Sequence, residues 1–526
     1  MKLNSTPSTA IRTETLCRIR RRFTPALTVL VFALAHNWPA IQAQTLPWMN
    51  TSLSPAARAE LLVGAMTLTE KIEQIALNTG PNPDLPGCGA RNDTRHIEGI
   101  ARLAIPTVRL TNGPIGVAGG DCDPNPPTTA VPTGLAVAAT WDPAASFRWG
   151  DIVGRETANI AHHVFLAPGV NLTRVPNAGR NFEYFGEDPY LSGRMAVEQI
   201  KAIQARGIQA AVKHYVANEQ ETNRNTMDTI VADRTLRELY LLPFEMSIKE
   251  GAAAAVMCSY PQIGGVFACE NSALLTQVLR KQWGFEGYIM SDRNATKSTA
   301  PSIKAGLDLE FASTAVWFTP ARIQASLAAG EITKADIDAM LNRRFTAMFR
   351  LGQFDHLLNR FTPVDSATHT RESRMISEQG SVLLKNENHI LPLADTSVRS
   401  IALIGSMTFA GAAKLPATGP GGLITVNTAG SVSPLDGLRN ALKTMSSRAT
   451  VTFNDGKDLE KARTLATNSD VAIVMAGDIS LEGEDRPNLS LPLRDGVDQD
   501  ALIASIAAAN PRTIVVLKNG GPVLMP

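Results

Sequence analysis

The most informative stretch of the sequence is residues 210–215, which read AAVKHY, an aliphatic run that ends in a lysine, a histidine and a tyrosine. The same pattern recurs at residues 107–114 (TVRLTNGP), 254–260 (AAVMCSY) and 288–292 (YIMSD). In a β/α barrel the functional groups lie just after the carboxyl ends of the strands. Four such endings in succession therefore predict one shared polar pocket.

Short aliphatic runs alternate with helical patterns from residue 55 to about residue 350, and residues 164–166 form a further strand candidate. The helical candidates are residues 53–66, 190–206, 234–250, 272–282 and 334–351. Alternation over this length predicts a parallel α/β architecture, and we expect a (β/α)8-like barrel over residues 47–355.

Residues 356–397 break this rhythm, and we interpret them as a linker with one docking helix at 373–385. A second alternation follows over residues 398–526, which predicts an open, doubly wound α/β sandwich domain. Its expected strands are 401–404, 450–453, 471–475 and 513–517, and its expected helices are 458–466 and 498–508. Because the sequence ends just after a strand and a Gly-Gly turn, we expect this domain to be incomplete at its C-terminus.

The composition is that of a globular protein. The chain has 526 residues, of which 44% are hydrophobic and 19% are charged, and this excludes wholesale disorder and a coiled-coil rod. Its 50 lysines and arginines balance 49 acidic residues, for a net charge of +1. That balance gives no electrostatic basis for a nucleic-acid partner.

Residues 1–43 have the features of a cleaved signal peptide. Four arginines between residues 18 and 22 precede the apolar run 27–35, and small and polar residues follow as far as Ala43. The alternative is a membrane anchor, but the run is too short for the about 20 apolar residues that a span needs. Residues 20–23 (RRRF) leave twin-arginine export open. We expect an exported protein, periplasmic or secreted, with no membrane attachment after cleavage.

Four cysteines would remain after cleavage, an even number that suits an oxidising compartment. Cys258 and Cys269 flank a Gly-Gly turn, where a disulfide would staple a hairpin. Cys88 and Cys122 bracket one strand-and-loop segment, and we expect a second disulfide there. The sequence has no Cys-x-x-Cys pair, so no structural zinc site is expected.

Asp292 is the most distinctive carboxylate, because it follows a fully apolar run and should be buried in part. Burial raises the pKa of a carboxyl group and nearby cations lower it, and Lys213 and Arg180 are candidate partners. The alternative is that Asp292 caps a helix.

Arg180 lies in a polar and aromatic stretch, residues 179–189 (GRNFEYFGEDP). Its guanidinium can hold sugar hydroxyls or a carboxylate, and the alternative is a buried salt bridge with Glu183 or Glu187. The adjacent Lys213 and His214 favour a pocket that binds hydroxyl oxygens over a histidine that is merely part of the core.

Two glycine-containing segments of the second domain need separate interpretations. Residues 480–486 (SLEGEDR) follow a strand and predict a mobile acidic loop, with a solvated turn or a calcium loop as alternatives, although no EF-hand spacing is present. Residues 419–422 (GPGG) lack the lysine of a phosphate-binding loop and do not lead from a strand into a helix, so they are interpreted as a plain loop.

Together these motifs resemble glycoside hydrolase family 3, the exo-acting β-glucosidase and β-xylosidase group. The resemblance runs from about residue 55 to the end of the sequence and implies a barrel followed by an α/β sandwich, with the active site at their junction. The segments that carry it are residues 112–114, 179–189, 213–214, 218–224 (NEQETNR), 257–260, 269–271 (CEN), 291–292 and 480–486.

Position by position, the resemblance implies that Asp292 is the nucleophile and that Glu482, on the second domain, is the general acid/base. Retaining hydrolysis needs two carboxyl groups about 5–5.5 Å apart, one ionised and one protonated. We expect cations to keep Asp292 ionised and the neighbouring Glu484 and Asp485 to favour the protonated form of Glu482. The residues implied to bind the sugar are Arg180, Lys213, His214, Arg224 and Tyr260.

The expected function is that of a retaining exo-β-glycosidase, which releases terminal β-D-glucosyl residues from a small-molecule β-glycoside or an oligosaccharide. The alternatives are a β-xylosidase, another specificity of the family, or a non-catalytic relative that binds sugar. No cofactor is implied, because hydrolysis at these carboxylates needs only water.

Three positions depart from the family pattern. Asn112 stands where the family usually has an aspartate that grips sugar hydroxyls, and Ala118 stands where many members have an arginine. Arg293 replaces a commonly aromatic residue beside the leaving group. Asn112 and Arg293 are therefore counted among the substrate-binding candidates, and the sugar and aglycone preferences stay open. The Lys-His-x-Pro-Gly pattern of the family's N-acetylglucosaminidases is absent from the sequence.

Overall fold

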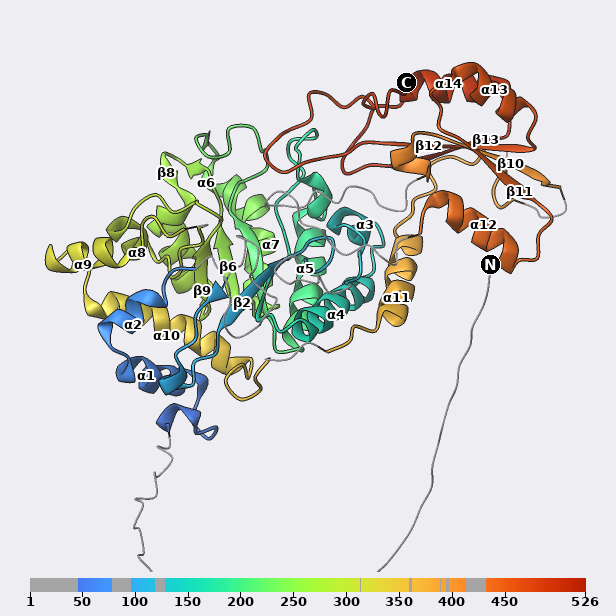
Figure 1. Cartoon of the computed structure of the whole chain (residues 1–526). Helices are drawn as coiled ribbons and strands as arrows, with labels where there is room; N and C mark the ends of the chain where they lie inside the picture. Colours follow the sequence, from blue (N-terminus) through green and yellow to red (C-terminus); the bar gives the residue numbers. More distant parts are fainter. Residues whose placement is uncertain are drawn as a thin grey trace, which may run out of the picture. The chain divides into compact units, whose positions relative to one another are not determined.

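A computed structural model of the chain describes residues 46–77, 96–118, 128–312, 314–358, 362–387, 389–393, 397–411 and 432–526, which are drawn in colour in Figure 1. Leu46–Pro526 form one compact unit. The expected signal peptide, Cys88, Cys122 and the segment 419–422 lie outside the described residues. Within the described residues, no helix is long and apolar enough to cross a membrane.

The first part of this unit is built on a six-stranded sheet with the order β1-β2-β3-β4-β6-β9. Strand β1 (His96–Ile97) is antiparallel to β2 (Val108–Asn112), and the strands from β2 onward are parallel. The other strands are β3 (Val164–Leu166), β4 (Gln209–Tyr215), β6 (Ala255–Cys258) and β9 (Tyr288–Ser291). Beyond β9, parallel bridges from Met290 to Leu309 and from Glu310 to Ala76 extend the sheet further. The sheet therefore has the barrel-like form predicted from the sequence.

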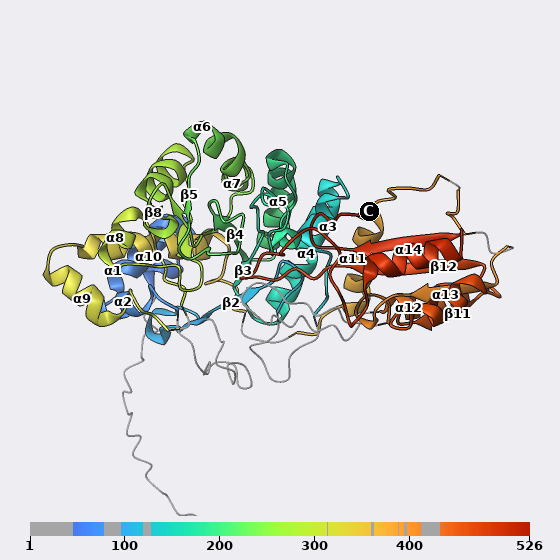
Figure 2. The same ribbon diagram turned by 90° about the horizontal axis from the view of Figure 1, so that it is seen from above.

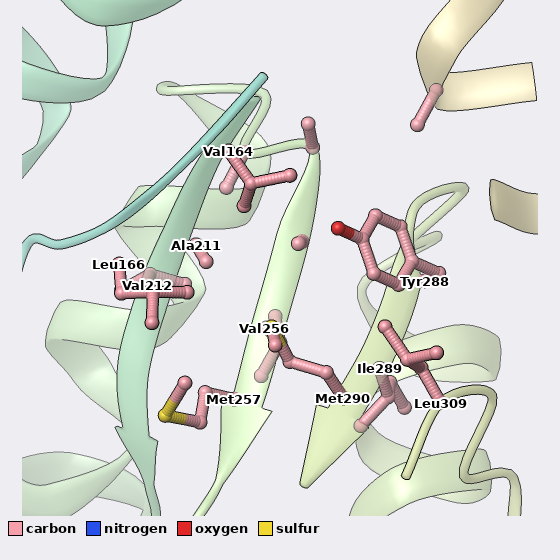
Figure 3. Close-up of a cluster of buried hydrophobic side chains, with 14 of the residues drawn as sticks. Val164, Leu166, Ala211, Val212, Val256, Met257, Tyr288, Ile289, Met290 and Leu309 are labelled. Atoms are coloured by element: carbon pink, nitrogen blue, oxygen red, sulfur yellow. The ribbon is translucent and has the colours of Figure 1, made fainter. Parts of the chain in front are cut away.

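The strands are aliphatic because side chains fill the barrel interior and helices cover its outside. Every residue of β2, β3, β4, β6 and β9 is buried. Figure 3 shows side chains such as Val212, Val256 and Met290 gathered between neighbouring strands. This apolar filling ends at the carboxyl ends of the strands, where the polar residues begin.

Helices surround the barrel sheet (Figures 1 and 2). The longer ones are α1 (Pro55–Ala65), α4 (Pro143–Asn159), α5 (Pro189–Gln204) and α10 (Lys334–Arg350), and the shorter ones are α2 (Leu68–Glu73), α3 (Gly134–Ala138), α6 (Asp233–Thr235), α7 (Leu242–Lys249), α8 (Ala300–Ala305) and α9 (Pro320–Ala328). Several begin with a proline behind a capping side chain, as Asp188 caps α5 by accepting the Leu191 N–H.

Two expected helices differ in detail from the observed ones. The helix expected at 234–250 is divided, because a π-helical segment, Leu236–Tyr240, lies between α6 and α7. The helix expected at 272–282 is π-helical over Ala273–Gln282.

Helix α11 (Ser366–Gln379) occupies the segment between the two sheets, and it begins and ends earlier than the helix expected at 373–385. It starts at Ser366 because the Asp365 carboxylate accepts the Thr368 N–H. It ends at Gln379, and at the next residue, Gly380, an added Cβ would lie only 2.3 Å from the Ala136 carbonyl oxygen. The His369 ring, 2.7 Å from Glu156, fixes α11 against α4.

The second sheet is parallel and has the order β11-β10-β12-β13. Its strands are β10 (Ser400–Ile404), β11 (Thr450–Asn454), β12 (Val471–Gly477) and β13 (Thr513–Lys518). On one face, Ala402 and Ile404 pack in a hydrophobic cluster with α13 (Leu459–Thr467) and α14 (Gln499–Ala509). On the other face, Ile401 and Leu403 belong to a cluster against which α12 (Pro434–Thr444) packs. Helices therefore cover both faces, as the doubly wound prediction requires.

Candidate active site

A pocket of about 380 Å³ lies at the carboxyl ends of the barrel strands and reaches the loop that follows β12. The structure brings together every residue that the sequence predicted for the site. The predicted residues that line the pocket are Asn112, Arg180, Lys213, His214, Arg224, Tyr260, Asp292, Arg293 and Glu482, and the remaining lining residues are Leu166, Asn225, Met257, Asn294 and Phe311. The shared polar pocket predicted from the strand ends is therefore present.

Asp292 stands directly after β9 and is 8% exposed. Its backbone N–H donates to the Cys258 carbonyl oxygen at 2.9 Å, and its Oδ1 accepts the Arg293 N–H at 2.6 Å. Its Oδ2 accepts no hydrogen bond from the described residues and lies 3.6 Å from His214 Nε2. The helix-cap interpretation is wrong, because the next helix, α8, begins only at Ala300. One carboxylate oxygen is thus anchored and the other is available to a ligand.

Arg180 and Lys213 share a buried carboxylate, Glu183. Arg180 donates from Nε and Nη2 to the two Glu183 oxygens at 3.0 and 2.9 Å, and Lys213 Nζ lies 3.5 Å from Glu183 Oε1. The salt bridge considered for Arg180 is therefore present, with Glu183 as the partner. Arg180 Nη1 has no hydrogen-bond partner among the described residues, so the same side chain keeps a donor for a ligand.

His214 is a neutral imidazole in this site. Its Nε2 lies 2.8 Å from Arg180 Nη2, which can only donate, so Nε2 accepts. Its Nδ1 then carries the proton and faces Asn171 Oδ1 at 3.3 Å. Burial, reinforced by the charges of Arg180 and Lys213, lowers the pKa of His214 well below its usual value.

Glu482 comes from the second domain and enters a network of charges on the barrel. Its Oε1 lies 2.9 Å from Arg224 Nη1 and 3.8 Å from Arg180 Nη1, and its side chain is 8% exposed. Arg224 also donates to Glu221 Oε2 at 2.6 Å, and its guanidinium lies 4.3 Å from the centre of the Tyr260 ring. Glu484, by contrast, is exposed and does not line the pocket.

The pKa shifts of the two carboxyl groups run in the directions opposite to the expected ones. Burial raises the pKa of Asp292 above its ordinary value, although the charges of Arg180 and Lys213 oppose this. Burial also raises the pKa of Glu482, but Arg180 and Arg224 outweigh it and hold that pKa below its ordinary value. The expectation failed because it placed Glu482 beside acidic neighbours in the sequence, whereas its neighbours in space are arginines.

The loop that carries Glu482 is docked on the barrel by hydrogen bonds, in contrast to the mobile loop that we expected. The Asp485 carboxylate accepts the backbone N–H groups of Gly179, Glu221 and Thr222 at 2.9–3.0 Å. Gly483 donates its N–H to Glu221 Oε2 at 2.7 Å. The solvated-turn interpretation is therefore wrong for this segment.

Asn112 and Arg293 complete the polar wall. Asn112 is the last residue of β2 and is 7% exposed, and its carbonyl oxygen accepts the Ala118 N–H. Arg293 is partly exposed beside Asp292 and lines the same pocket. In the part of the chain that the structure describes, no group of three or more metal-ligating side chains is gathered.

Comparison with known proteins places this architecture in a family. The sequence profile of the glycosyl hydrolase family 3 N-terminal domain matches residues 108–347, and the profile of the family's C-terminal domain matches residues 381–526. The chain belongs to glycosyl hydrolase family 3.

Individual relatives agree with this assignment. The chain is 33% identical over 455 residues to thermostable beta-glucosidase B of Acetivibrio thermocellus. The aligned region covers 82% of this chain and 58% of that protein. It is 32% identical over 450 residues to an exo-alpha-(1->6)-L-arabinopyranosidase of Bifidobacterium longum, with 81% and 58% covered. The crystal structure of DesR, a beta-glucosidase from Streptomyces venezuelae in complex with D-glucose, matches with a TM-score of 0.77 at 29% identity, over 89% of this chain and 73% of that one. The chain thus spans 58% of the length of each of the first two relatives.

Three carboxylates of the site were undervalued in the sequence analysis: Glu183 was considered only as an alternative partner of Arg180, Asp485 only as an acidic neighbour of Glu482, and Glu221 was given no individual role. All three lie within motif segments that had been quoted, so their type and position were visible. The partners of Glu221 and Asp485 were not visible, because these two residues form hydrogen bonds between the barrel and the second domain. A carboxylate within three residues of an arginine, as in Glu183 and Arg180 or Glu221 and Arg224, was the only local signal.

Proposed function

We propose that the protein is a retaining exo-β-glycosidase that acts on terminal β-D-glucosyl residues. The observation that carries this proposal is the placement of two carboxylates, Asp292 from the barrel and Glu482 from the second domain, in one pocket. Paired carboxylates with different surroundings are what glycoside hydrolysis requires. The β-glucosidases among the relatives support glucose as the sugar.

In the first step, Asp292 Oδ2 attacks the anomeric carbon while the bond from that carbon to the leaving oxygen breaks. Glu482 gives its proton to the departing oxygen, which leaves as an alcohol. The free lone pairs of Oδ2 suit it to attack, since Oδ1 is already held by the Arg293 N–H. The raised pKa of Asp292 also makes its carboxylate more basic, and therefore a better nucleophile, once it is ionised.

In the second step, water attacks the anomeric carbon of the glycosyl-enzyme and Glu482 accepts its proton, so that Asp292 is released as a carboxylate. The lowered pKa of Glu482 suits this role as a base. For the first step Glu482 must be protonated. A sugar hydroxyl that accepts a hydrogen bond from Arg224 would weaken the pair between Arg224 and Glu482 and so raise the pKa of Glu482.

The sugar is held by donors that already have a buried counter-charge. Arg180, Lys213 and Arg224 each pair with Glu183 or Glu221, so their charge is compensated before the substrate arrives. The cavity of about 380 Å³ lies at the small end of the range for small-molecule sites, roughly 300–1,000 Å³. That size favours one terminal sugar over a long stretch of polysaccharide.

A second candidate specificity is a different terminal pyranoside, such as a β-xyloside or an α-L-arabinopyranoside. Asn112 favours it, because a neutral amide replaces a carboxylate usual in the family at the wall of the pocket. The similarity to an exo-alpha-(1->6)-L-arabinopyranosidase points the same way.

The test is nitrophenol release by the purified chain from the β-D-glucopyranoside, the β-D-xylopyranoside and the α-L-arabinopyranoside, with Asp292→Asn as the blank. We expect the glucoside to have the largest kcat/KM. A larger kcat/KM for another glycoside would change the proposed sugar specificity but leave the proposed hydrolytic mechanism in place. No release from any of them by a folded chain would favour a protein that only binds sugar.

We also propose that residues 1–43 direct export and are removed, on the basis of the basic segment and the short apolar run that follows it. N-terminal sequencing of the protein recovered outside the cytoplasm should begin just after Ala43. An intact N-terminus on the active protein would contradict this.

A further inference from the structure

The segment 481–486, which carries Glu482, is held to the barrel by the residues that follow Glu482. It forms a tight turn, closed by the bridge between Leu481 and Glu484, with Gly483 at a φ of +88°. On the far side of the turn, Arg486 donates its N–H to the Asn177 carbonyl oxygen, and Asn177 returns a hydrogen bond to the Arg486 carbonyl oxygen. The turn therefore has a defined place against the barrel.

Asp485 makes the densest part of this contact. Its Oδ1 accepts the N–H groups of Gly179 and Glu221 at 3.0 and 2.9 Å, and its Oδ2 accepts the Thr222 N–H at 2.9 Å. Gly179 precedes Arg180, while Glu221 and Thr222 precede Arg224. One carboxylate of the second domain thus ties together the two barrel loops whose arginines face Glu482.

Hydrogen bonds from N–H groups to an ionised carboxylate are stronger than those to a neutral acceptor. The bonds from Thr222, Glu221 and Gly179 outweigh the effect of burial and hold the pKa of Asp485 below its ordinary value. An amide in its place has one acceptor oxygen and an NH2 group that would face an N–H donor.

We infer that Asp485 is a positioning residue, which sets the place of Glu482 and of the arginines beside it without itself reaching the substrate. This inference rests on the proposed function, because it assigns the second-domain loop to proton transfer. Asp485 does not line the pocket. Its loss should therefore impair proton transfer to the leaving oxygen and leave nucleophilic attack by Asp292 intact.

The barrel side of the contact offers an independent way to disturb it. A Cβ added at Gly179 would lie 2.0 Å from the Glu484 carbonyl oxygen and 2.1 Å from that of Leu481. Both oxygens are backbone atoms of the turn, so the turn must move away. Gly179→Ala changes no charge and no pocket side chain, yet it displaces the same loop.

The experiment measures kcat/KM, which reports the first, glycosylation step, on β-glucosides whose leaving groups range from methanol to 2,4-dinitrophenol, for Asp485→Asn and Gly179→Ala. General-acid help matters most for strongly basic leaving groups, and misplacing a catalytic group by about 1 Å costs about 100-fold. We expect both variants to lose about 10- to 100-fold on the methyl glucoside and less than about threefold on the dinitrophenyl glucoside. Added azide should restore part of the dinitrophenyl-substrate turnover wherever deglycosylation is limiting.

The matched controls are Glu484→Gln, an exposed carboxylate on the same turn, and Gly64→Ala, a helical glycine at which an added Cβ would meet open space. Both should behave as wild type, and circular dichroism and thermal melting should show all variants folded. An equal loss on all substrates, no loss, or unfolding of Asp485→Asn would overturn the inference. An inactive wild-type chain would instead count against the proposed function.

Discussion

On the barrel side of the site, Asp292 follows a buried strand, and its backbone N–H donates to Cys258 of the neighbouring strand. On the other side, Glu482 stands on a turn whose restraining hydrogen bonds all run to other loops, several of them on the barrel. The first carboxylate is placed by the sheet itself and the second by contacts between domains. Changes near Asp292 should therefore affect every substrate, whereas changes near Glu482 should affect substrates according to their leaving groups.

The largest effect is expected for Asp292→Asn, which removes the nucleophilic charge and keeps the volume. Turnover should fall by about 10⁴-fold or more on every glycoside, including activated ones. Nitrophenol assays and thermal melting measure activity and fold together. The exposed Asp233→Asn serves as the control, and near-normal activity of a folded Asp292→Asn protein would remove Asp292 from the mechanism.

Glu482→Ala should have the next largest effect, and it should depend on the substrate. Loss of general-acid help is expected to cost about 10²- to 10⁴-fold on poor leaving groups and far less on activated ones. Azide should then accelerate turnover of activated substrates and give a β-glycosyl azide, identified by mass spectrometry. A uniform loss without azide rescue would remove Glu482 from the role of general acid/base.

Arg224→Gln should shift the pH dependence of kcat/KM. Arg224 lies 2.9 Å from Glu482 and helps to hold its pKa low. Removing this cation makes the ionised form less favourable, so the pKa of Glu482 should rise and the alkaline limb of the profile should move to higher pH. The exposed Arg234→Gln is the control. An alkaline limb that stays in place or moves to lower pH would mean that another group controls it.

Removing the Cys258–Cys269 disulfide should have the smallest effect on chemistry. The bridge closes the hairpin of β7 (Gln262–Ile263) and β8 (Val266–Phe267), as predicted. Replacing both cysteines by serine should lower the free energy of unfolding by about 2–3 kcal/mol, measured by urea denaturation. Because this bridge belongs to the barrel side alone, the relative rates on good and poor leaving groups should not change. A change in the ratio of these rates would contradict the assignment of leaving-group dependence to the Glu482 side alone.

Much of this architecture could be read from local patterns. Aliphatic runs that end in Asn112, Lys213 or Asp292 predicted strands and their polar ends, because burial on both faces and a functional rim leave a clear mark on the sequence. The start of α11 was missed because its first turn is polar, and only the cap by Asp365 reveals it. The π-helical segments carry no pattern that separates them from α-helices.

The site itself was predictable as a set of residues but not as a set of contacts. The sequence places Glu482 next to Glu484 and Asp485, and reasoning from those neighbours gave it a raised pKa. In the folded chain Arg224 and Arg180 surround Glu482, and the direction is reversed. Such contacts depend on how two domains meet, which neither periodicity nor spacing encodes.

Trapping the glycosyl-enzyme would show whether Asp292 is the nucleophile of a retaining mechanism. The protein is treated with an activated 2-deoxy-2-fluoro-β-glucoside, and the labelled peptide is identified by mass spectrometry. We expect time-dependent inactivation, a mass increase of one fluoroglucosyl group, and the label on Asp292. A label on any other carboxylate, or hydrolysis of ordinary glucosides with inverted configuration, would contradict this mechanism.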